Sequence, residues 1–412
     1  MPDPAAAGSP PPLTEWLTQM LDDVAGLPPG AGPLTFGHLY GPDEAAYPAA
    51  DLDAAHTAAV RRAEPEIDLL MMTTCLTLQR PYTFPFRTGV FSFCPDCWRS
   101  YFPASVVAHL VDHSELPSPK SQQVDGVAVT IDQNCPHHPG TPVRNLPPAE
   151  KLPVVLGVRL SLSFPGLISA IPFHTIDFTR APGRQGLIEV WFSDGGITSN
   201  FPIHFFDQLW PRRPTFGLNL ADAHPDFPDD LVWRPTRNAS GILPRPRGIT
   251  SMMSFLGAVV GSMHNWVDNS AVPAPGFRDR VVELRTRDGE GGLNLKMAPE
   301  TIEELGRRGD LAAQQLEGFD FDNHRWIRYR TAMLALSDVL AGLGRGYPDY
   351  APFVAARRDG SYPFPSRVSA EADLAATEQL MGVQRLWEDA GYPATGGPPP
   401  QPRPRLRPVL PQ

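Results

Sequence analysis

Two short segments of this chain carry side chains that suit metal binding. Cys94 and Cys97 form a Cys-x-x-Cys pair, and Cys135 and His137 lie in a second segment that starts 38 residues after Cys97. Two thiolates on one turn, with a third thiolate and an imidazole from another loop, would complete a tetrahedral zinc site. The separation of the two segments exceeds that of common zinc fingers, so reduced, unligated loop cysteines are the competing interpretation.

Asp194 is the second candidate for chemistry, because it follows the apolar run 187–192 and precedes Gly195 and Gly196. An acidic side chain at the carboxyl end of a buried strand lies where open α/β sheets place reactive groups. The two glycines permit a sharp turn and a close approach of the backbone. Asp-Gly-Gly by itself is also a common turn sequence.

The elements that would position these residues follow from the apolar pattern. Short apolar runs predict strands, and helical spacing of apolar residues predicts helices between and after them. Strands interleaved with helices of this length predict an α/β fold with a mostly parallel central sheet. The predicted strands are 66–78, 154–160, 187–192, 215–220 and 280–286, and the predicted helices are 13–24, 106–111, 161–171, 250–269, 299–316 and 323–343.

Proline content marks the expected boundaries. Residues 1–12 form a polar, Pro-rich lead-in, and 391–412 a tail rich in proline and arginine, so both are predicted to be disordered. Residues 113–150 are polar, contain seven prolines and show no sustained period, which indicates a long loop or insertion. We expect one α/β domain over 13–390.

Longer segments of the chain resemble the patatin-like phospholipases, a family of lipid acyl hydrolases. Residues 190–202 (VWFSDGGITSNFP) resemble the second catalytic motif of that family, and residues 159–172 resemble the segment before it. Further segments resemble a bacterial branch of the family, and the resemblance runs from about residue 33 to residue 345. These further segments are 71–74, 79–82, 265–269, 289–295 and 322–326.

This resemblance implies a three-layer α/β/α sandwich and a serine–aspartate dyad that hydrolyses a lipid or another acyl ester. Asp194 matches the aspartate that takes the proton of the serine, and Gly195 and Gly196 match the glycines that support it. No Gly-x-Ser-x-Gly sequence occurs in this chain, and no Gly-Gly-Gly-like loop precedes residue 190. The fold is therefore expected to be N-terminally incomplete, with the nucleophile supplied by an N-terminal segment.

Two alternatives from other classes remain open. One is a catalytically silent scaffold or interaction protein that keeps the patatin-like fold. The other is a binding module stabilised by zinc at Cys94, Cys97, Cys135 and His137.

Charge and composition exclude several classes of protein. The net charge of −10 argues against binding nucleic acid through bulk charge. No apolar stretch reaches the roughly 18 residues that a spanning helix needs, so membrane contact is expected to be peripheral at most. Four cysteines do not make a disulfide scaffold, and residues 1–12 lack the features of a secretory signal. We therefore expect a cytoplasmic protein.

Overall fold

The chain folds into two compact units in this computed structural model. One contains the described residues up to Asn200 together with 261–262, and the other contains the remaining described residues from Phe201 onward. The prediction of one domain over 13–390 stays a prediction. The structure describes residues 11–41, 65–86, 89–124, 126–235, 248–252, 254–256, 258–259, 261–262, 275–287, 289–291, 294, 296–355 and 367–392.

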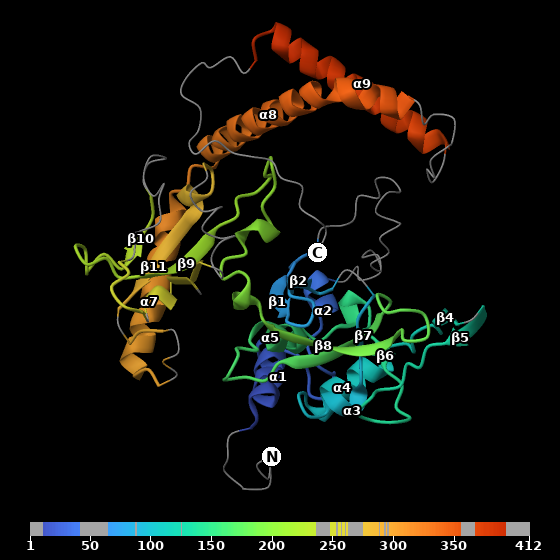
Figure 1. The fold of residues 1–412 in the computed structure, drawn as a ribbon. Helices are drawn as coiled ribbons and strands as arrows, with labels where there is room; N and C mark the ends of the chain where they lie inside the picture. The colour runs from blue at the N-terminus through green and yellow to red at the C-terminus, as the bar shows by residue number, and fades with distance from the viewer. Residues whose placement is uncertain are drawn as a thin grey trace. The chain divides into compact units, whose positions relative to one another are not determined.

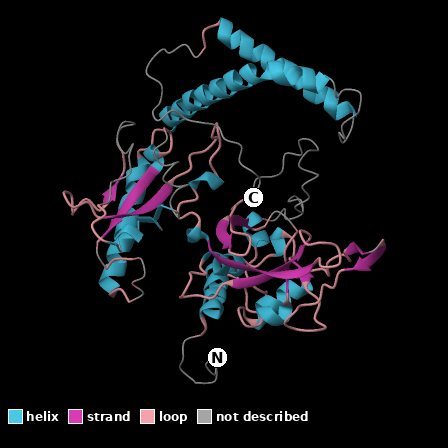
Figure 2. Cartoon of the chain, in the orientation of Figure 1, coloured by secondary structure: helices cyan, strands magenta, loops and turns pink. Residues whose placement is uncertain are grey.

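A six-stranded sheet forms the centre of the first unit (Figures 1 and 2). Its order is β2-β1-β8-β7-β3-β6, so β8 lies between β1 and β7, and every pair of neighbours runs antiparallel. The strands are β1 (Met71–Cys75), β2 (Arg80–Phe84), β3 (Ser92–Phe93), β6 (Arg144–Asn145), β7 (Ile171–Asp177) and β8 (Gly186–Asp194).

The predicted three-layer sandwich with a mostly parallel sheet is therefore wrong. Antiparallel neighbours need only a short turn between them, and β1–β2 and β7–β8 are joined in this way, whereas parallel neighbours need a crossover. Residues 154–160, predicted as a strand, lie in helix α5 (Val154–Ser161). A fully buried helix gives the same continuous apolar run as a buried strand. Of residues 161–171, predicted as a helix, Ser161 ends α5, 162–170 form turns and irregular backbone, and Ile171 begins β7.

Helices and aromatic side chains complete this unit. Helices α1 (Leu13–Val24) and α4 (Ala104–Asp112) confirm the helices predicted at 13–24 and 106–111. The expected loop 113–150 contains a two-stranded hairpin, β4 (Ser121–Val124) with β5 (Val127–Thr130). Two shorter helices are α2 (Phe36–Tyr40) and α3 (Pro95–Trp98). The core gathers rings around Phe86, whose centroid lies 5.1 to 5.9 Å from those of Tyr82, Phe84, Phe91, Phe173 and Phe192.

The second unit has a three-stranded sheet and long helices. Strand β11 (Val281–Thr286) runs parallel to β9 (Gly217–Asp222) and antiparallel to β10 (Val232–Trp233). These strands confirm the predictions at 215–220 and 280–286, and α7 (Pro299–Glu317) and α8 (Phe321–Ala355) confirm those at 299–316 and 323–343. The last described helix is α9 (Arg367–Asp389).

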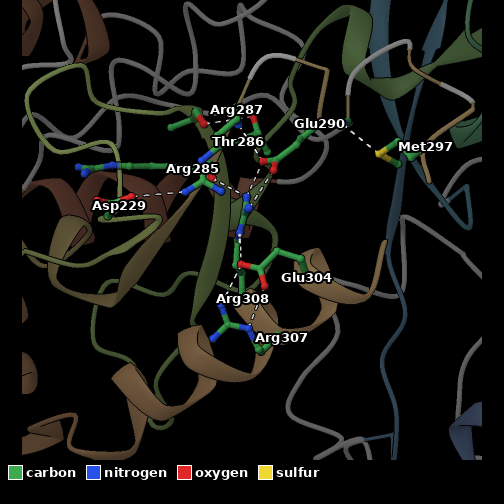
Figure 3. A network of polar contacts seen from close by, with 11 residues as sticks. Asp229, Arg285, Thr286, Arg287, Glu290, Met297, Glu304, Arg307 and Arg308 are labelled. Atoms are coloured by element: carbon green, nitrogen blue, oxygen red, sulfur yellow. Dashed lines mark hydrogen bonds and ion pairs between the residues drawn. The ribbon is translucent and has the colours of Figure 1, made fainter. Parts of the chain in front are cut away.

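A buried arginine holds α7 against the end of β11 (Figure 3). Arg308 is 1% exposed, and its guanidinium donates two hydrogen bonds of 2.6 and 2.9 Å to the carboxylate of Glu290. It also donates to Glu304 of α7 and to the carbonyl of Arg285. These bonds hold the pKa of Glu290 down at about 2.

Several predictions fall wholly or partly outside the described residues. They include most of the lead-in 1–12 and of the tail 391–412, and much of the helix predicted over 250–269. Among the helices of the described segments, none combines the length and the apolar character needed to cross a membrane.

Candidate metal centre

The first pair of cysteines lies on a short turn at the end of β3. Cys94 directly follows β3 and precedes α3, and Cys97 lies one helical turn later. The carbonyl of Cys94 accepts a 3.1 Å hydrogen bond from the backbone N–H of Trp98. The buried indole of Trp98 donates a 2.7 Å bond to the carbonyl of Pro172 at β7. The turn that carries both thiols is thereby fixed to the sheet.

A tight loop carries the other two side chains. The backbone N–H of Cys135 donates to the carbonyl of Thr141 at 2.8 Å, and that of His138 donates to the carbonyl of Cys135 at 3.2 Å. Gly140 has a φ of +86°, which a residue with a side chain rarely adopts. The N–H of Val143 donates to the carbonyl of Gln133 and closes the base of the loop. The loop therefore presents Cys135 and His138 together.

The two turns bring four ligand atoms together. The Sγ atoms of Cys94, Cys97 and Cys135 and the Nδ1 atom of His138 all lie within 4.8 Å of one another. The distance from Cys97 Sγ to Cys135 Sγ is 3.6 Å, and Nδ1 lies 3.8, 3.3 and 3.9 Å from the sulfurs of Cys94, Cys97 and Cys135. The edges of a tetrahedral zinc site are about 3.8 Å between sulfurs and about 3.6 Å between sulfur and nitrogen. The cluster thus has the size of a four-coordinate metal site.

His138, not His137, completes this cluster. The side chain of His137 is 56% exposed, and its Nε2 atom lies 2.9 Å from Oε2 of Glu189 on β8. His138 lies three positions after Cys135, and in a turn a residue at that spacing lies on the same side as the first one. Cys94 with Cys97 and Cys135 with His138 share that spacing, and this shared spacing is the sequence signal that would have identified His138.

The surroundings of the thiols oppose their ionisation unless a cation is bound. Burial raises the pKa of Cys94 and of Cys97, and the neighbouring thiols raise that of Cys97 further. Three thiolates in such a place repel one another, and a bound metal ion stabilises the deprotonated form that it needs as ligand. Three soft sulfurs and one imidazole are a donor set that suits zinc and related metals. The remaining cysteine, Cys75, is buried in β1 apart from this cluster.

Asp194 lies at the carboxyl end of β8, opposite Thr73 of β1. Its Oδ1 atom accepts a 2.6 Å hydrogen bond from the backbone N–H of Gly196. A side chain at Gly195 would collide with the carbonyl oxygen of Met72, so this position requires glycine. The side chain is half-buried, and burial raises its pKa.

A buried arginine, which sequence reasoning missed, supports the end of β8. The guanidinium of Arg159 donates to Oγ of Ser163 at 2.7 Å and to the carbonyl of Ser169 at 3.0 Å. The carbonyl of Ser163 accepts a 3.1 Å bond from the N–H of Asp194 and a 2.7 Å bond from the hydroxyl of Ser193. The segments 159–172 and 190–202, which carry the resemblance described above, are therefore in contact at Asp194.

The comparisons with known proteins give one curated relative. A protein of Rhizobium meliloti (strain 1021) named RpoH suppressor is 31% identical over 458 aligned residues. The alignment covers 96% of this chain and 66% of that protein, so the chain spans slightly less than two thirds of the relative's length. No family model matches the chain, and no solved structure matches it.

Proposed function

We propose that this chain is part of a lipid acyl hydrolase of the serine–aspartate type, in which Asp194 is the general base. The observation that carries the proposal is the position of Asp194, half-buried at the end of a central strand and oriented by the N–H of Gly196. The contact between the segments 159–172 and 190–202 supports it, because both contribute to the resemblance. The proposal rests on this site and not on a parallel sheet.

The chemistry would be hydrolysis of a carboxylic ester in a lipid or another acyl compound. A serine hydroxyl attacks the ester carbonyl and transfers its proton to the Asp194 carboxylate, which passes it to the departing alcohol as the ester C–O bond breaks. Water then attacks the acyl-serine, gives a proton to Asp194 and releases the carboxylic acid and the free serine. A carboxylate whose pKa is raised by burial accepts that proton more readily than an exposed one. The N–H of Gly196 holds Oδ1, which leaves Oδ2 to accept the proton. The serine comes from a segment outside this sequence, since the chain contains no Gly-x-Ser-x-Gly elbow.

We also propose that the ion held by Cys94, Cys97, Cys135 and His138 is zinc in a structural role. Four protein ligands fill a tetrahedron and leave no position for a reactive water, which is typical of structural zinc. The ion would cross-link the loop 133–143 to the turn after β3. It would thereby stabilise the unit that carries Asp194 without taking part in the reaction.

The test compares the 412-residue chain with a longer protein that includes any Gly-x-Ser-x-Gly segment encoded directly upstream. The chain alone should neither hydrolyse p-nitrophenyl esters above background nor react with fluorophosphonate probes. The longer protein should do both, and Asp194→Asn should abolish its ester hydrolysis. Stoichiometric labelling of a serine in the chain alone would overturn the argument, as would full activity of the Asp194→Asn protein.

A second candidate is a catalytically silent interaction protein stabilised by zinc. The closed four-ligand cluster is the observation behind it, because such a centre can stabilise a fold that has no catalytic activity. Stoichiometric zinc binding together with an inactive longer protein would support this candidate over the hydrolase.

A further inference from the structure

A fifth polar side chain lies against the four-ligand cluster. His174 of β7 is fully buried, and its Nε2 atom lies 3.9 Å from Sγ of Cys135. β7 places it there by register, because His174 pairs with Ser92 of β3 immediately before the Cys94 turn. On the other side His174 pairs with Glu189 of β8, which holds His137. The ring is therefore fixed by the sheet and not by the metal-binding loops.

Of the two ring nitrogens of His174, only Nε2 has a polar neighbour among the described residues, and that neighbour is the sulfur of Cys135. Nδ1 is buried without a hydrogen-bond partner in the described part of the chain. An imidazole carries an N–H that can lie on Nε2, and a thiolate at Cys135 offers that N–H an acceptor.

We infer that His174 donates an N–H···S hydrogen bond to the Cys135 thiolate of the metal-loaded centre and stabilises the bound ion without ligating it. The N–H stabilises part of the negative charge on the buried sulfur. Without this hydrogen bond, the metal ion alone would have to stabilise that charge. Groups that hold metal ligands in this way typically contribute 10–100-fold in metal affinity. The inference rests on the zinc centre proposed above and adds a positioning residue to it.

The test measures zinc affinity by competition with a chelator, using the full chain with His174→Phe and His174→Gln. Phenylalanine fills the space but has no N–H, so the affinity should fall about 10–100-fold. The side-chain amide of glutamine can donate a hydrogen bond from a similar place, so His174→Gln should keep most of the zinc affinity. The control is His113→Phe, which removes an exposed imidazole and should leave the affinity unchanged.

Cobalt substitution separates this inference from the centre itself. The thiolate-to-cobalt absorption band should shift in His174→Phe, while X-ray absorption still shows three sulfurs and one nitrogen around the ion. Unchanged affinity in His174→Phe would refute the hydrogen bond. Loss of the nitrogen ligand in that variant would make His174 a ligand and also overturn the inference. Failure of the unmodified chain to bind zinc or cobalt would instead refute the centre.

Discussion

The hydroxyl of Thr141 donates a 2.8 Å hydrogen bond to Oδ2 of Asp96. Asp96 lies between the first two ligands, Cys94 and Cys97, and Thr141 accepts the backbone hydrogen bond of Cys135 at the end of the second loop. The two turns that carry the candidate ligands are thus joined by a protein hydrogen bond. We expect this bond to hold the candidate ligands in place without a metal ion.

Thr141→Val should weaken zinc binding about 10-fold, because it removes this hydrogen bond and keeps the shape of the side chain. Chelator competition measures the change. Thr130→Val on the exposed strand β5 is the matched control and should bind zinc as the unmodified chain does. Equal affinity of the two variants would show that the bond does not pre-position the ligands.

His138→Ala and His137→Ala should differ sharply although the two residues are neighbours. The first removes a ligand atom that lies 3.3 Å from Cys97 Sγ, so zinc binding should weaken by at least about 100-fold. The second removes only the contact with Glu189 and should change affinity by less than about 10-fold. Isothermal titration of both variants with zinc gives the comparison. The reverse order would restore His137 as the ligand.

Asp194→Asn should raise the melting temperature at neutral pH. The pKa of Asp194 is raised by burial in the folded state above its ordinary value of 3.8. The folded state therefore favours the neutral acid, and ionisation of Asp194 destabilises it as the pH rises from about 3.8 through the higher folded pKa. Below that window both proteins carry a neutral side chain and should melt together. A lower melting temperature for Asp194→Asn at pH 7 would contradict the effect of burial.

The pH dependence of stability that we expect from Glu290 is opposite to that from Asp194. Its pKa of about 2 lies below the ordinary 4.5 because Arg308 binds the carboxylate. The ion pair stabilises the fold fully above about pH 4.5, and this stability is lost as the pH falls toward 2. Glu290→Gln should therefore destabilise the second unit at pH 7, with a difference that shrinks on acidification. Urea unfolding at pH 7 and pH 3 measures it, and a difference that grows at low pH would contradict the assignment.

Arg159→Met should destabilise the first unit by about 2 kcal/mol, because Ser163 and Ser169 lose hydrogen bonds from a buried charged group. Urea unfolding checks the value. Arg99→Met is the control, since that arginine is 64% exposed and should change stability by less than about 0.5 kcal/mol. If both variants unfold alike, Arg159 does not hold the end of β8.

Local patterns in the sequence identified most long elements but not the sheet. The amphipathic run 13–24 and the apolar run 187–192 have a clear period or length, and both form the predicted element as α1 and β8. The run 154–160 is apolar at nearly every position, so neither the helical period of about 3.6 residues nor the strand period of about 2 can be recognised in it. Its assignment as a strand supplied part of the βαβ alternation, so the error spread from one segment to the whole topology.

The metal cluster could be predicted for three of its four ligands. Cysteine is rare in this chain, which makes each Cys-Pro turn conspicuous, whereas His137 and His138 are adjacent and differ only in which side of the turn they face. Arg159 gave no signal, because its role depends on carbonyl and hydroxyl groups that only folding brings to it. Hydrogen bonds from a buried side chain to such groups leave no recognisable pattern in the sequence.

The four ligand residues differ in their access to solvent, and this sets the order in which they would release an ion. Cys94 and Cys135 are buried, whereas Cys97 and His138 are partly exposed and lie 3.3 Å apart at their ligand atoms. An incoming chelator or competing metal therefore meets Cys97 and His138 first, one from each turn. Exchange would begin at this face, while the two buried thiolates keep hold of the ion and limit the rate at which it leaves.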